Sequence, residues 1–333
     1  MEKTNYAMKK TIAIICGGDT SEHDVSMRSA AGIESFMDHQ RYDIYKIEIH
    51  AGQWNALLPD GQQSPVDRND FTFTDRHGRR IRPDFCYITI HGAPGENGVL
   101  QGYLDLISMP YSTSGVLVEA LTYDKFATNN YMRSLGVKVA DSLTIRIGQE
   151  DQVSDQDIID RIGLPCFVKP SRGGSSFGTT KVKTPQDLRP AIQLALREGE
   201  DVMVEAYMQG TEITCGCYKT KTVSHVFPIT EVVTTNEFFD YDAKYNGQVD
   251  EITPARISDR LTQRVQTLTS TIYDILGCYG IIRIDYIITQ GDVINLLEIN
   301  TTPGMTPTSF IPQQVRAAGL DISEVMTDII ENR

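Results

Sequence analysis

Two stretches of this chain combine residue types that could bind a phosphorylated ligand and a metal ion. The first, "PCFVKPSRGGSSFGTT" at residues 165–180, runs from a short apolar strand through Lys169 into a loop of glycines and hydroxyls. Glycine lets a backbone approach a ligand closely, and exposed N–H groups beside a lysine suit an anionic oxygen such as phosphate. The lysine precedes the glycines, so the stretch does not match a P-loop. Taken alone, it also fits an ordinary turn between two strands.

The second stretch is the strand pair "GIIRIDYIIT" and "VINLLEINTTPG" near the C-terminus. With Gln290 and Gly291 as the hairpin turn, Arg283 is predicted to lie opposite Glu298, and Asp285 one pair away. Residues two apart share a face of a strand. The predicted chemical face therefore holds Arg283, Asp285, Glu298 and Asn300. The predicted core face holds Ile282, Ile284, Tyr286, Leu297 and Ile299.

The chemical face of this hairpin could bind a metal ion. Asp285, Glu298 and Asn300 offer three oxygen ligands, which suit a hard cation such as Mg²⁺. A solvated face with a cross-strand Arg–Glu pair is the plain alternative. The following "NTTPG" predicts a sharp turn whose backbone N–H groups lie beside the metal. ATP bound between the lysine-led loop and the metal ligands would account for both stretches.

The composition indicates a soluble globular protein of two or three domains, with 333 residues, 40% of them apolar and 23% charged. A net charge of −13 without a basic patch argues against nucleic acid or anionic lipid as a partner. The six cysteines form no CxxC pair. No apolar run reaches the ~20 residues of a membrane span. We therefore expect a cytoplasmic protein with buried free thiols.

Strands and helices alternate in the first third of the chain. The expected elements are "TIAIIC", a helix from about Asp24, "YDIYKIEI", "DFCYITIH", a helix from about Val99, and "MPYSTSG". This order is typical of a parallel sheet covered by helices, and residues 52–80 interrupt it. From about Gly115 the pattern changes, with a helix carrying Lys125 and then further strands and helices. The sequence predicts an α/β fold.

The motifs of the chain occur in the order found in one known family. The chain resembles the D-alanine:D-alanine ligases of the ATP-grasp superfamily. The matching segments are "GGDTSEHDVS", "HGAPGENGVLQG", "VKPSRGGSSFG", "EFFDYDAKY", "RIDY" and "LLEINTTPGMTPTSFIP". The resemblance implies an ATP-grasp fold preceded by an N-terminal Rossmann-like α/β domain. The implied parts are an N-terminal domain at 1–114, a central ATP-grasp subdomain at 115–204, and a C-terminal ATP-grasp subdomain at 205–333 that carries the metal and substrate site.

The resemblance also implies how the nucleotide is held. Lys125 and Lys169 match lysines that contact the ATP phosphates, and Ser176 lies in the loop that covers them. Two ions of Mg²⁺ or Mn²⁺ are implied, bound by Asp285, Glu298 and Asn300.

The adenine and ribose of ATP are assigned to one further segment by the resemblance. Its adenine-contacting residues are Glu205, Ala206, Tyr207 and Met208. Ala206 stands where relatives often carry lysine, so we expect backbone groups to hold the adenine. Glu212 matches the acid that binds the ribose.

The first D-alanine is assigned to residues from five segments. Glu22 matches the acid that binds its ammonium group, and Ser175 and Tyr245 match partners of Glu22 in a hydrogen-bonded triad. Arg283 and the N–H of Gly304 match groups around the reacting carboxyl.

The second D-alanine is assigned mainly to residues near the C-terminus. Lys244, Ser309 and the N–H of Phe310 match groups that bind its carboxylate, and His91 matches a histidine near this substrate. Asn97 replaces the aspartate common in this family's motif and is expected to change only a loop hydrogen bond. Taken singly, each of these residues has an ordinary structural role as its alternative, and their joint order favours the ligase.

The implied activity is ATP-dependent ligation of two D-alanines to D-alanyl-D-alanine through an acylphosphate, for peptidoglycan precursors, by a homodimer. The alternative within the family is a D-alanine:D-lactate ligase. A nicotinamide-dependent oxidoreductase is disfavoured because the chain has no GxGxxG fingerprint. A catalytically inactive ATP-binding regulator is disfavoured because Lys169, Arg283 and the metal ligands are all present.

Replacing Tyr245 with phenylalanine should weaken discrimination against D-lactate. The resemblance associates tyrosine here with dipeptide products and phenylalanine with some ester products. The shift should be largest at lower pH, where the amine of D-alanine is more fully protonated. We would measure competition between D-alanine and D-lactate at two pH values and separate the products by mass. An unchanged product ratio at both pH values would show that Tyr245 is not the discriminating residue.

Overall fold

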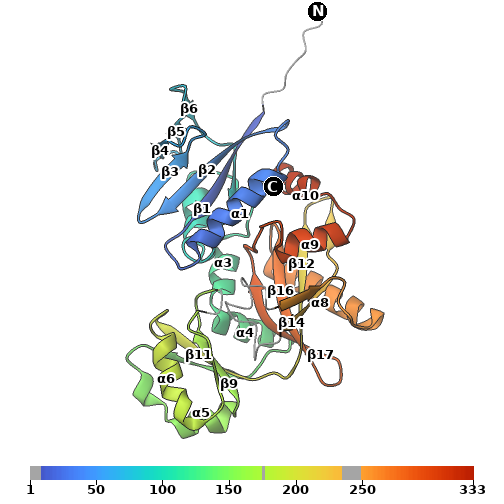
Figure 1. Cartoon of the computed structure of the whole chain (residues 1–333). Helices are drawn as coiled ribbons and strands as arrows, with labels where there is room; N and C mark the ends of the chain where they lie inside the picture. The colour runs from blue at the N-terminus through green and yellow to red at the C-terminus, as the bar shows by residue number, and fades with distance from the viewer. Residues whose placement is uncertain (1–8, 175–176, 235–248) are drawn as a thin grey trace, which may run out of the picture.

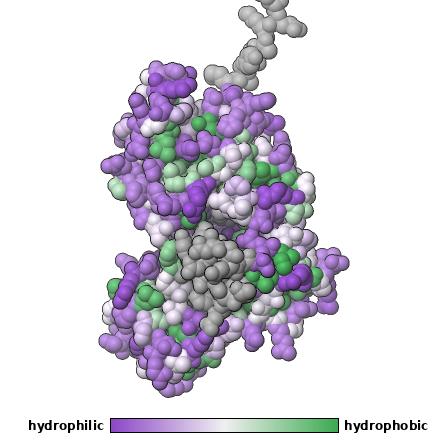
Figure 2. Space-filling view, viewed as in Figure 1, coloured by the Kyte–Doolittle hydropathy of each residue, from purple (hydrophilic) through white to green (hydrophobic). Residues whose placement is uncertain are grey.

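The computed structural model describes residues 9–174, 177–234 and 249–333. Their strands form three larger sheets and one two-stranded sheet. Figure 1 shows the first sheet in one lobe of the molecule, the second in another, and the third beside both. The visible face in Figure 2 is largely hydrophilic, in keeping with the charged composition.

The first sheet has the strand order β4-β3-β2-β1-β7. Its strands β2, β1 and β7 are parallel, as predicted, and the apolar run of β1, between β2 and β7, is buried. The excursion at 52–80 adds two antiparallel strands to its edge and a small hairpin. The elements are β1 (Lys10–Gly17), α1 (His23–Phe36), β2 (Tyr42–His50), β3 (Gln53–Leu57), β4 (Gln63–Pro65), β5 (Phe73–Thr74), β6 (Arg80–Ile81), β7 (Phe85–Ile88) and α2 (Val99–Leu106).

The segment "MPYSTSG" does not form the strand expected of it. Tyr111 makes only a single parallel bridge to Cys86. Two short helices then lead away from the first sheet, and they are α3 (Val116–Tyr123) and α4 (Lys125–Ser134). The side chain of Asp124 caps α4 by accepting from the Ala127 N–H at 3.0 Å, so α4 begins at Lys125.

The second sheet is antiparallel, with the order β10-β9-β11-β8. Two amphipathic helices pack on it through a shared apolar core, and the N-terminus of one is capped by Ser154. The glycine loop predicted to bind phosphate connects β9 and β10. The elements are β8 (Ser142–Arg146), η1 (Glu150–Gln152), α5 (Asp155–Ile162), β9 (Cys166–Pro170), β10 (Thr180–Val182), α6 (Pro185–Ala195) and β11 (Asp201–Ala206).

The third sheet has the order β15-β14-β12-β16-β17, with β13 paired to β12. The long helix α8 packs on it and ends at Gly277, which adopts a left-handed conformation. The elements are β12 (Gly210–Lys219), β13 (Ser224–Val226), β14 (Thr230–Thr234), β15 (Val249–Ile252), α8 (Asp259–Leu276), β16 (Ile282–Thr289), β17 (Val293–Asn300), α9 (Phe310–Ala317) and α10 (Ile322–Glu331).

The turn between β16 and β17 is longer than predicted. Thr289 pairs with Val293 rather than with Asp292, so three residues form the turn. Asp292, with φ of 57°, occupies the left-handed region that aspartate tolerates better than most residues.

A β-bulge in the same hairpin shifts the pairing once more. It lies between Asp285 and Tyr286, and beyond it Asp285 lies opposite Glu298 and Arg283 opposite Asn300. The predicted pairing of Arg283 with Glu298 is therefore wrong by two residues. The bulge nevertheless brings Asp285 and Glu298 directly across from each other, which draws these two carboxylates closer than the predicted register did.

The bulge also changes which leucine enters the core. Leu296 pairs with Tyr286 and is fully buried, whereas the predicted core residue Leu297 is only partly buried. The remaining residues predicted for this core face, Ile282, Ile284, Tyr286 and Ile299, are buried in one cluster.

A single hydrophobic core joins the beginning and the end of the chain. It contains Ile12 and Ile14 of β1, Ile33 of α1, Met305, and Ile329 of α10. Figure 1 shows α10 lying near α1. The first sheet is therefore fixed against the C-terminal helices, and the loop after β17 is held between them.

Replacing Gly32 with alanine should destabilise this junction. An added Cβ on Gly32 would lie 2.3 Å from the carbonyl oxygen of Met305, which is too close for any real contact. By helix propensity alone, alanine in place of glycine would stabilise α1 by about 1 kcal/mol. A fall in the urea concentration at the unfolding midpoint would therefore indicate the steric clash with Met305. Gly102→Ala in α2 is the matched control, because its nearest atom would be a Val116 methyl at 3.7 Å. Equal midpoints for the two variants would contradict the prediction.

Candidate active site

A cavity of about 550 Å³ lies where the first sheet, the glycine loop and the third sheet meet. Its wall includes residues from α1, the loop after β7, the α3–α4 junction, β15, β16, β17 and the start of α9. The predicted site residues that line it are Glu22, His91, Lys125, Arg283, Glu298, Asn300, Gly304, Ser309 and Phe310. Segments far apart in the sequence thus contribute to one site.

Asp285 is the most extensively bonded of the predicted metal ligands. Its two carboxylate oxygens accept hydrogen bonds from Arg283 Nε and a terminal nitrogen of Arg283 at 2.9 and 2.8 Å. Thr214 of β12 donates to it at 2.5 Å, and Asn300 Nδ2 donates at 3.1 Å. Asp285 is buried, so this bonding offsets the cost of desolvating its charge.

The donor set around Asp285 fits a hard cation. Because Asn300 donates through its amide nitrogen, its amide oxygen remains the atom that could bind a metal, as carboxylate oxygens of Asp285 and Glu298 could. Among the described residues, no three His, Cys, Asp or Glu side chains form a cluster that could hold a metal ion. The third protein ligand would therefore be an amide, with phosphate and water completing the coordination, as Mg²⁺ prefers.

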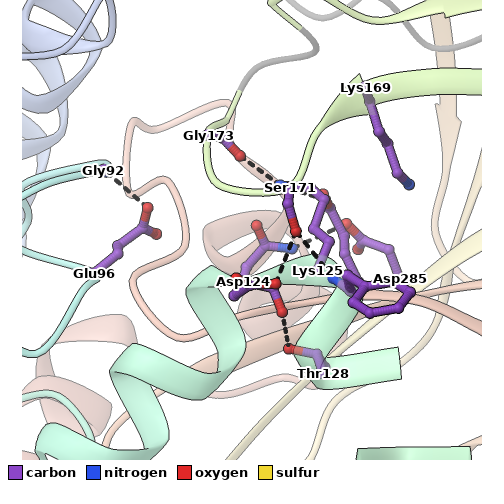
Figure 3. A network of polar contacts seen from close by, with 12 residues as sticks. Gly92, Glu96, Asp124, Lys125, Thr128, Lys169, Ser171, Gly173 and Asp285 are labelled. Atoms are coloured by element: carbon purple, nitrogen blue, oxygen red, sulfur yellow. Dashed lines mark hydrogen bonds and ion pairs between the residues drawn. The ribbon is translucent and has the colours of Figure 1, made fainter. Parts of the chain in front are cut away.

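Lys125 connects the glycine loop to the metal-ligand hairpin. Its Nζ donates to the carbonyl of Gly173 and lies 3.9 Å from a Glu298 oxygen. Figure 3 shows Lys125 beside Gly173, with Asp285 nearby. The backbone N–H of Lys125 donates to the Ser171 carbonyl at 2.9 Å. The cation predicted to contact phosphate is thus held between the loop and the hairpin.

The beginning of the glycine loop is fastened to the start of α4. Ser171 Oγ donates to Asp124 at 2.8 Å, and Arg172 donates to the other oxygen of Asp124 at 3.2 Å. Hydrogen bonding to Ala127, Ser171 and Arg172 outweighs burial and lowers the pKa of Asp124 below its usual value. The N-cap of α4 is therefore also the anchor of the loop.

Glu22 directly contacts the other end of the described loop segment. An added Cβ on Gly174 would lie 2.3 Å from a Glu22 carboxylate oxygen, so a larger residue here would displace the end of the Glu22 side chain. Glu22 itself is the N-cap residue of α1 and is buried. This contact places an acid of the first sheet against the loop of the second sheet, as the predicted triad requires.

His91 is buried in the cavity wall as a neutral group. Burial, reinforced by Arg283, lowers the pKa of His91 below its usual value, although Glu22 opposes the shift. Its Nε2 lies 3.2 Å from Ser29 Oγ, and Ser29 also accepts from the Met305 N–H at 3.4 Å. These contacts connect His91 to the loop after β17.

Ser309 and Phe310 lie at the N-terminus of α9. Ser309 is its N-cap residue, and its Oγ accepts from the Thr306 N–H at 3.1 Å. Gly304 lies against Ser309, and the ring of Phe310 is 5.3 Å from the Arg283 guanidinium carbon. A helix N-terminus beside these residues suits a carboxylate, as predicted for the second substrate.

Lys169 and Glu205 form a second, buried cluster outside the lining of this cavity. Lys169 Nζ lies 2.6 Å from Glu205, and Asn129 Nδ2 donates to the other Glu205 oxygen at 3.1 Å. Both oxygens of the Glu205 side chain are therefore already bonded within the protein. This favours backbone rather than side-chain contacts from this segment to an adenine.

The residues after Glu205 lie at the end of β11 and the beginning of β12. The Ala206 N–H donates to the Asp141 carbonyl at 2.8 Å. Tyr207 has Lys181 Nζ 4.0 Å from its ring centre, and Met208 follows in the link to β12. Glu212 lies on β12. The structure places these predicted adenine and ribose contacts together, apart from the 550 Å³ cavity.

Four predicted site residues are not among the described ones. They are Ser175, Ser176, Lys244 and Tyr245. Their assigned roles remain predictions from the sequence.

Glu96 is a cavity residue to which no role was assigned, although it lies in the quoted motif "HGAPGENGVLQG". Burial, reinforced by Glu22, raises the pKa of Glu96 to about 8, against the opposing effects of the Gly92 N–H and Lys125. Figure 3 shows its hydrogen bond with Gly92, which is 2.7 Å long. Its carboxyl can thus bind or release a proton near neutral pH inside the cavity.

Glu119 of α3 was also missed, and it supports the loop that follows Asn300. It is fully buried and accepts from Thr301 Oγ1 at 2.6 Å, while its other oxygen has no hydrogen-bond partner among the described residues. Burial raises the pKa of Glu119 well above its usual value. Nothing in the sequence around Glu119, an acidic residue in a helix, indicates that its side chain is buried.

Models of one protein family match almost the entire chain. Residues 11–114 match the D-ala D-ala ligase N-terminus, and residues 131–331 match the D-ala D-ala ligase C-terminus. This chain belongs to the D-alanine–D-alanine ligase family. The family predicted from the sequence motifs is thereby confirmed.

Full-length relatives of this ligase chain are closely similar to it. It is 65% identical to D-alanine–D-alanine ligase of Bacteroides fragilis (strain YCH46) over 326 residues, covering 98% of this chain and 100% of that one. It is 52% identical to the enzyme of the same name from Porphyromonas gingivalis (strain W83), covering 98% of each chain. The relatives are enzymes, and their names do not favour the D-lactate alternative.

Solved structures of related ligases share the fold. D-alanyl-alanine synthetase A of Vibrio cholerae superposes with a TM-score of 0.86 at 28% identity, covering 98% of this chain and 99% of that one. The VanG D-Ala:D-Ser ligase of Enterococcus faecalis gives 0.85 at 31% identity, covering 97% and 99%. These ligases have the ATP-grasp fold, so the predicted fold class is confirmed.

Replacing Glu119 with glutamine should remove a pH-dependent loss of stability. Because its pKa is raised on folding, the native state keeps a proton that the unfolded chain releases above about pH 4.3. Stability of the unmodified protein should therefore fall as the pH rises above that value, and glutamine, which does not titrate, should lessen the fall. We would compare urea unfolding at about pH 5 and about pH 8. Glu200→Gln, at an exposed site, is the control. An identical pH dependence in all three proteins would contradict the prediction.

Proposed function

We propose that this protein joins two D-alanine molecules into D-alanyl-D-alanine and hydrolyses ATP to ADP and phosphate as it does so. The observation that carries this proposal is the convergence of Glu22, Lys125, Arg283, Glu298 and Asn300 on one cavity. These groups supply an ammonium site, a phosphate-binding cation and a metal site within one chamber. The names of the full-length relatives support the same reaction.

The first half of the proposed reaction activates a carboxylate. A carboxylate is a poor electrophile at neutral pH, so the γ-phosphoryl group of ATP is transferred to the carboxylate of the first D-alanine. Such transfer depends on positioning and on neutralising charge. Glu22 would bind the substrate's ammonium group, and Lys125 and Lys169 would contact the phosphates. Lys125 donates a hydrogen bond to the glycine loop, and Lys169 lies in β9, the strand that leads into this loop. A similar D-alanine–D-alanine ligase, from Bacillus anthracis, has been solved in complex with ATP.

Mg²⁺ or Mn²⁺, as two ions, would be held by Asp285, Glu298 and Asn300. The metal would supply positive charge to the phosphoryl oxygens. The protein's own contribution is to hold these ligands across one hairpin and to keep Arg283 beside them, where its guanidinium remains available to the reacting carboxyl.

The second half of the reaction forms the peptide bond. The neutral amine of the second D-alanine attacks the acylphosphate, while Arg283 and the Gly304 N–H would stabilise the oxyanion. Ser309 and the N–H of Phe310, at the start of α9, would bind the carboxylate of this substrate. Enclosure of the cavity would exclude water, which would otherwise hydrolyse the acylphosphate.

The proposal extends to the domains and the setting of the enzyme. We infer three parts, at 1–114, 115–204 and 205–333, and a homodimer in the cytoplasm that supplies peptidoglycan precursors. No described helix is long and apolar enough to cross a membrane. Size-exclusion chromatography with light scattering tests the dimer.

Mass spectrometry of the products tests the reaction itself. The purified protein is incubated with ATP, Mg²⁺ and D-alanine, and D-alanyl-D-alanine, ADP and phosphate are expected in equal amounts. Replacing half of the D-alanine with D-lactate distinguishes the dipeptide ligase from the ester-forming alternative. A predominantly ester product at neutral pH would overturn the proposal.

Glu298→Gln and Asp285→Asn should each reduce turnover by orders of magnitude, because both remove a metal-binding charge with little change of shape. Both should also bind fewer Mn²⁺ ions in the presence of ATP, as measured by electron paramagnetic resonance. Asp292→Asn, in the turn of the same hairpin and outside the cavity, is the matched control. Normal turnover and normal Mn²⁺ binding in both variants would falsify the metal assignment.

A further inference from the structure

Glu251 of β15 is a carboxylate in the cavity wall that the proposed mechanism does not use. It is partly buried and lines the same cavity as Arg283 and Ser309. The residues on either side of Glu251 in β15 do not indicate that it lines a cavity, since Asp250 is exposed and Ile252 is an ordinary apolar strand residue. Its presence in the cavity follows from the packing of β15 beside α9.

Glu251 is fastened to the beginning of α9. Gln313 Nε2 donates both to Glu251 and, at 2.6 Å, to the Thr308 carbonyl. Thr308 directly precedes Ser309, the N-cap residue of α9. The side-chain amide of Gln313 therefore holds the Glu251 carboxyl close to the start of α9, which would bind the carboxylate of the second D-alanine.

Within the described residues, no cationic side chain neutralises the charge of Glu251 by direct contact. Its hydrogen bond comes from a neutral amide, and it forms no ion pair with any described residue. On β14 it faces Val232, which is buried, and the charged group that acts on it from β16 is Arg283. Burial raises the pKa of Glu251, and the Gln313 hydrogen bond and Arg283 oppose this shift. A cation in the cavity would complete the environment of this carboxylate.

An α-amino acid bound at the start of α9 would bring such a cation. Only one carbon atom separates its carboxylate from its ammonium group. With the carboxylate on Ser309 and the N–H of Phe310, as proposed above, the ammonium would lie within reach of acids in the adjoining wall. A lone carboxylate beside an anion-binding helix start would repel the substrate. A zwitterion removes that conflict, because each of its charges has a partner.

We propose that Glu251 binds the ammonium group of the second D-alanine and accepts its proton, and thereby makes the site prefer an amine over a hydroxyl. The proposal rests on the ligase function proposed above. D-Lactate carries a neutral hydroxyl in place of the ammonium, so it gains no charge interaction with Glu251. This discrimination is separate from any contribution of Tyr245.

The proton and bond changes of the step balance. One proton passes from the ammonium to the Glu251 carboxylate and leaves a neutral amine. The amine nitrogen forms a bond to the acyl carbon, and the bond from that carbon to the phosphate oxygen breaks. The second amine proton leaves with the phosphate, and Glu251 returns its proton to solvent. No oxidant or further reactant is needed.

Competition between D-alanine and D-lactate tests this role with Glu251→Gln. The ratio of dipeptide to ester should fall roughly tenfold or more, the effect expected from losing one charge-assisted hydrogen bond. The KM for the second D-alanine should rise, whereas the KM values for ATP and for the first D-alanine should stay unchanged. The rate of ester formation with D-lactate should be retained, which also shows that the variant is folded and still activates the first substrate.

Two further variants complete the design. Asp250→Asn, at the exposed neighbouring position, should leave the product ratio unchanged. Glu251→Asp keeps the charge and should restore much of the preference. An unchanged ratio in Glu251→Gln, or an equal loss of dipeptide and ester, would overturn the proposal. If the unmodified protein joined no amino acids at all, the proposed function would fail instead, so the two failures are distinguishable.

Discussion

The carboxylate of Asp285 is the point around which the site is arranged. It accepts hydrogen bonds from Arg283, Thr214 and Asn300, which belong to three adjacent strands. A buried anion is costly unless it is fully bonded, so these three donors are held in fixed positions relative to one another. The same bonds hold Arg283 and Asn300 in the cavity wall. The arrangement of side chains that serves the proposed chemistry is therefore also the arrangement that supplies Asp285 with its hydrogen bonds.

The charges of the cavity explain why cations must accompany the substrates. Its described lining contains four acids, Glu22, Glu96, Glu251 and Glu298, beside the cations of Arg28, Lys125 and Arg283, so the cavity carries no clear excess of positive charge. Phosphates entering such a chamber meet repulsion unless positive charge enters with them. In the proposed reaction, metal ions and the ammonium groups of amino acids would supply that charge. The raised pKa of Glu96 has the same origin, since burial and a neighbouring acid disfavour one more negative charge.

The sequence predicted local features well and long-range ones poorly. The apolar run of β1, the helix beginning near Asp24 and the polar face of the last hairpin follow from periodicity, and all are present. The register of that hairpin was predicted wrongly, because the bulge at Asp285 and the left-handed Asp292 have no distinctive sequence signal. Family motifs supplied most site residues. Nine of these residues line one cavity, and the predicted roles of the site residues stay predictions.

Residues outside such motifs could not be found in advance. Glu119 and Glu251 lie in a helix and a strand where an acid would ordinarily face solvent, and only tertiary packing buries them. Packing also bears on the choice of the second substrate. The shared fold includes a D-Ala:D-Ser ligase, so the architecture alone does not determine which nucleophile is used. The choice must then depend on side chains in the wall around the second amino acid. Charge in that wall separates ammonium groups from hydroxyls more sharply than shape does, because the two groups are nearly equal in size and differ by one unit of charge.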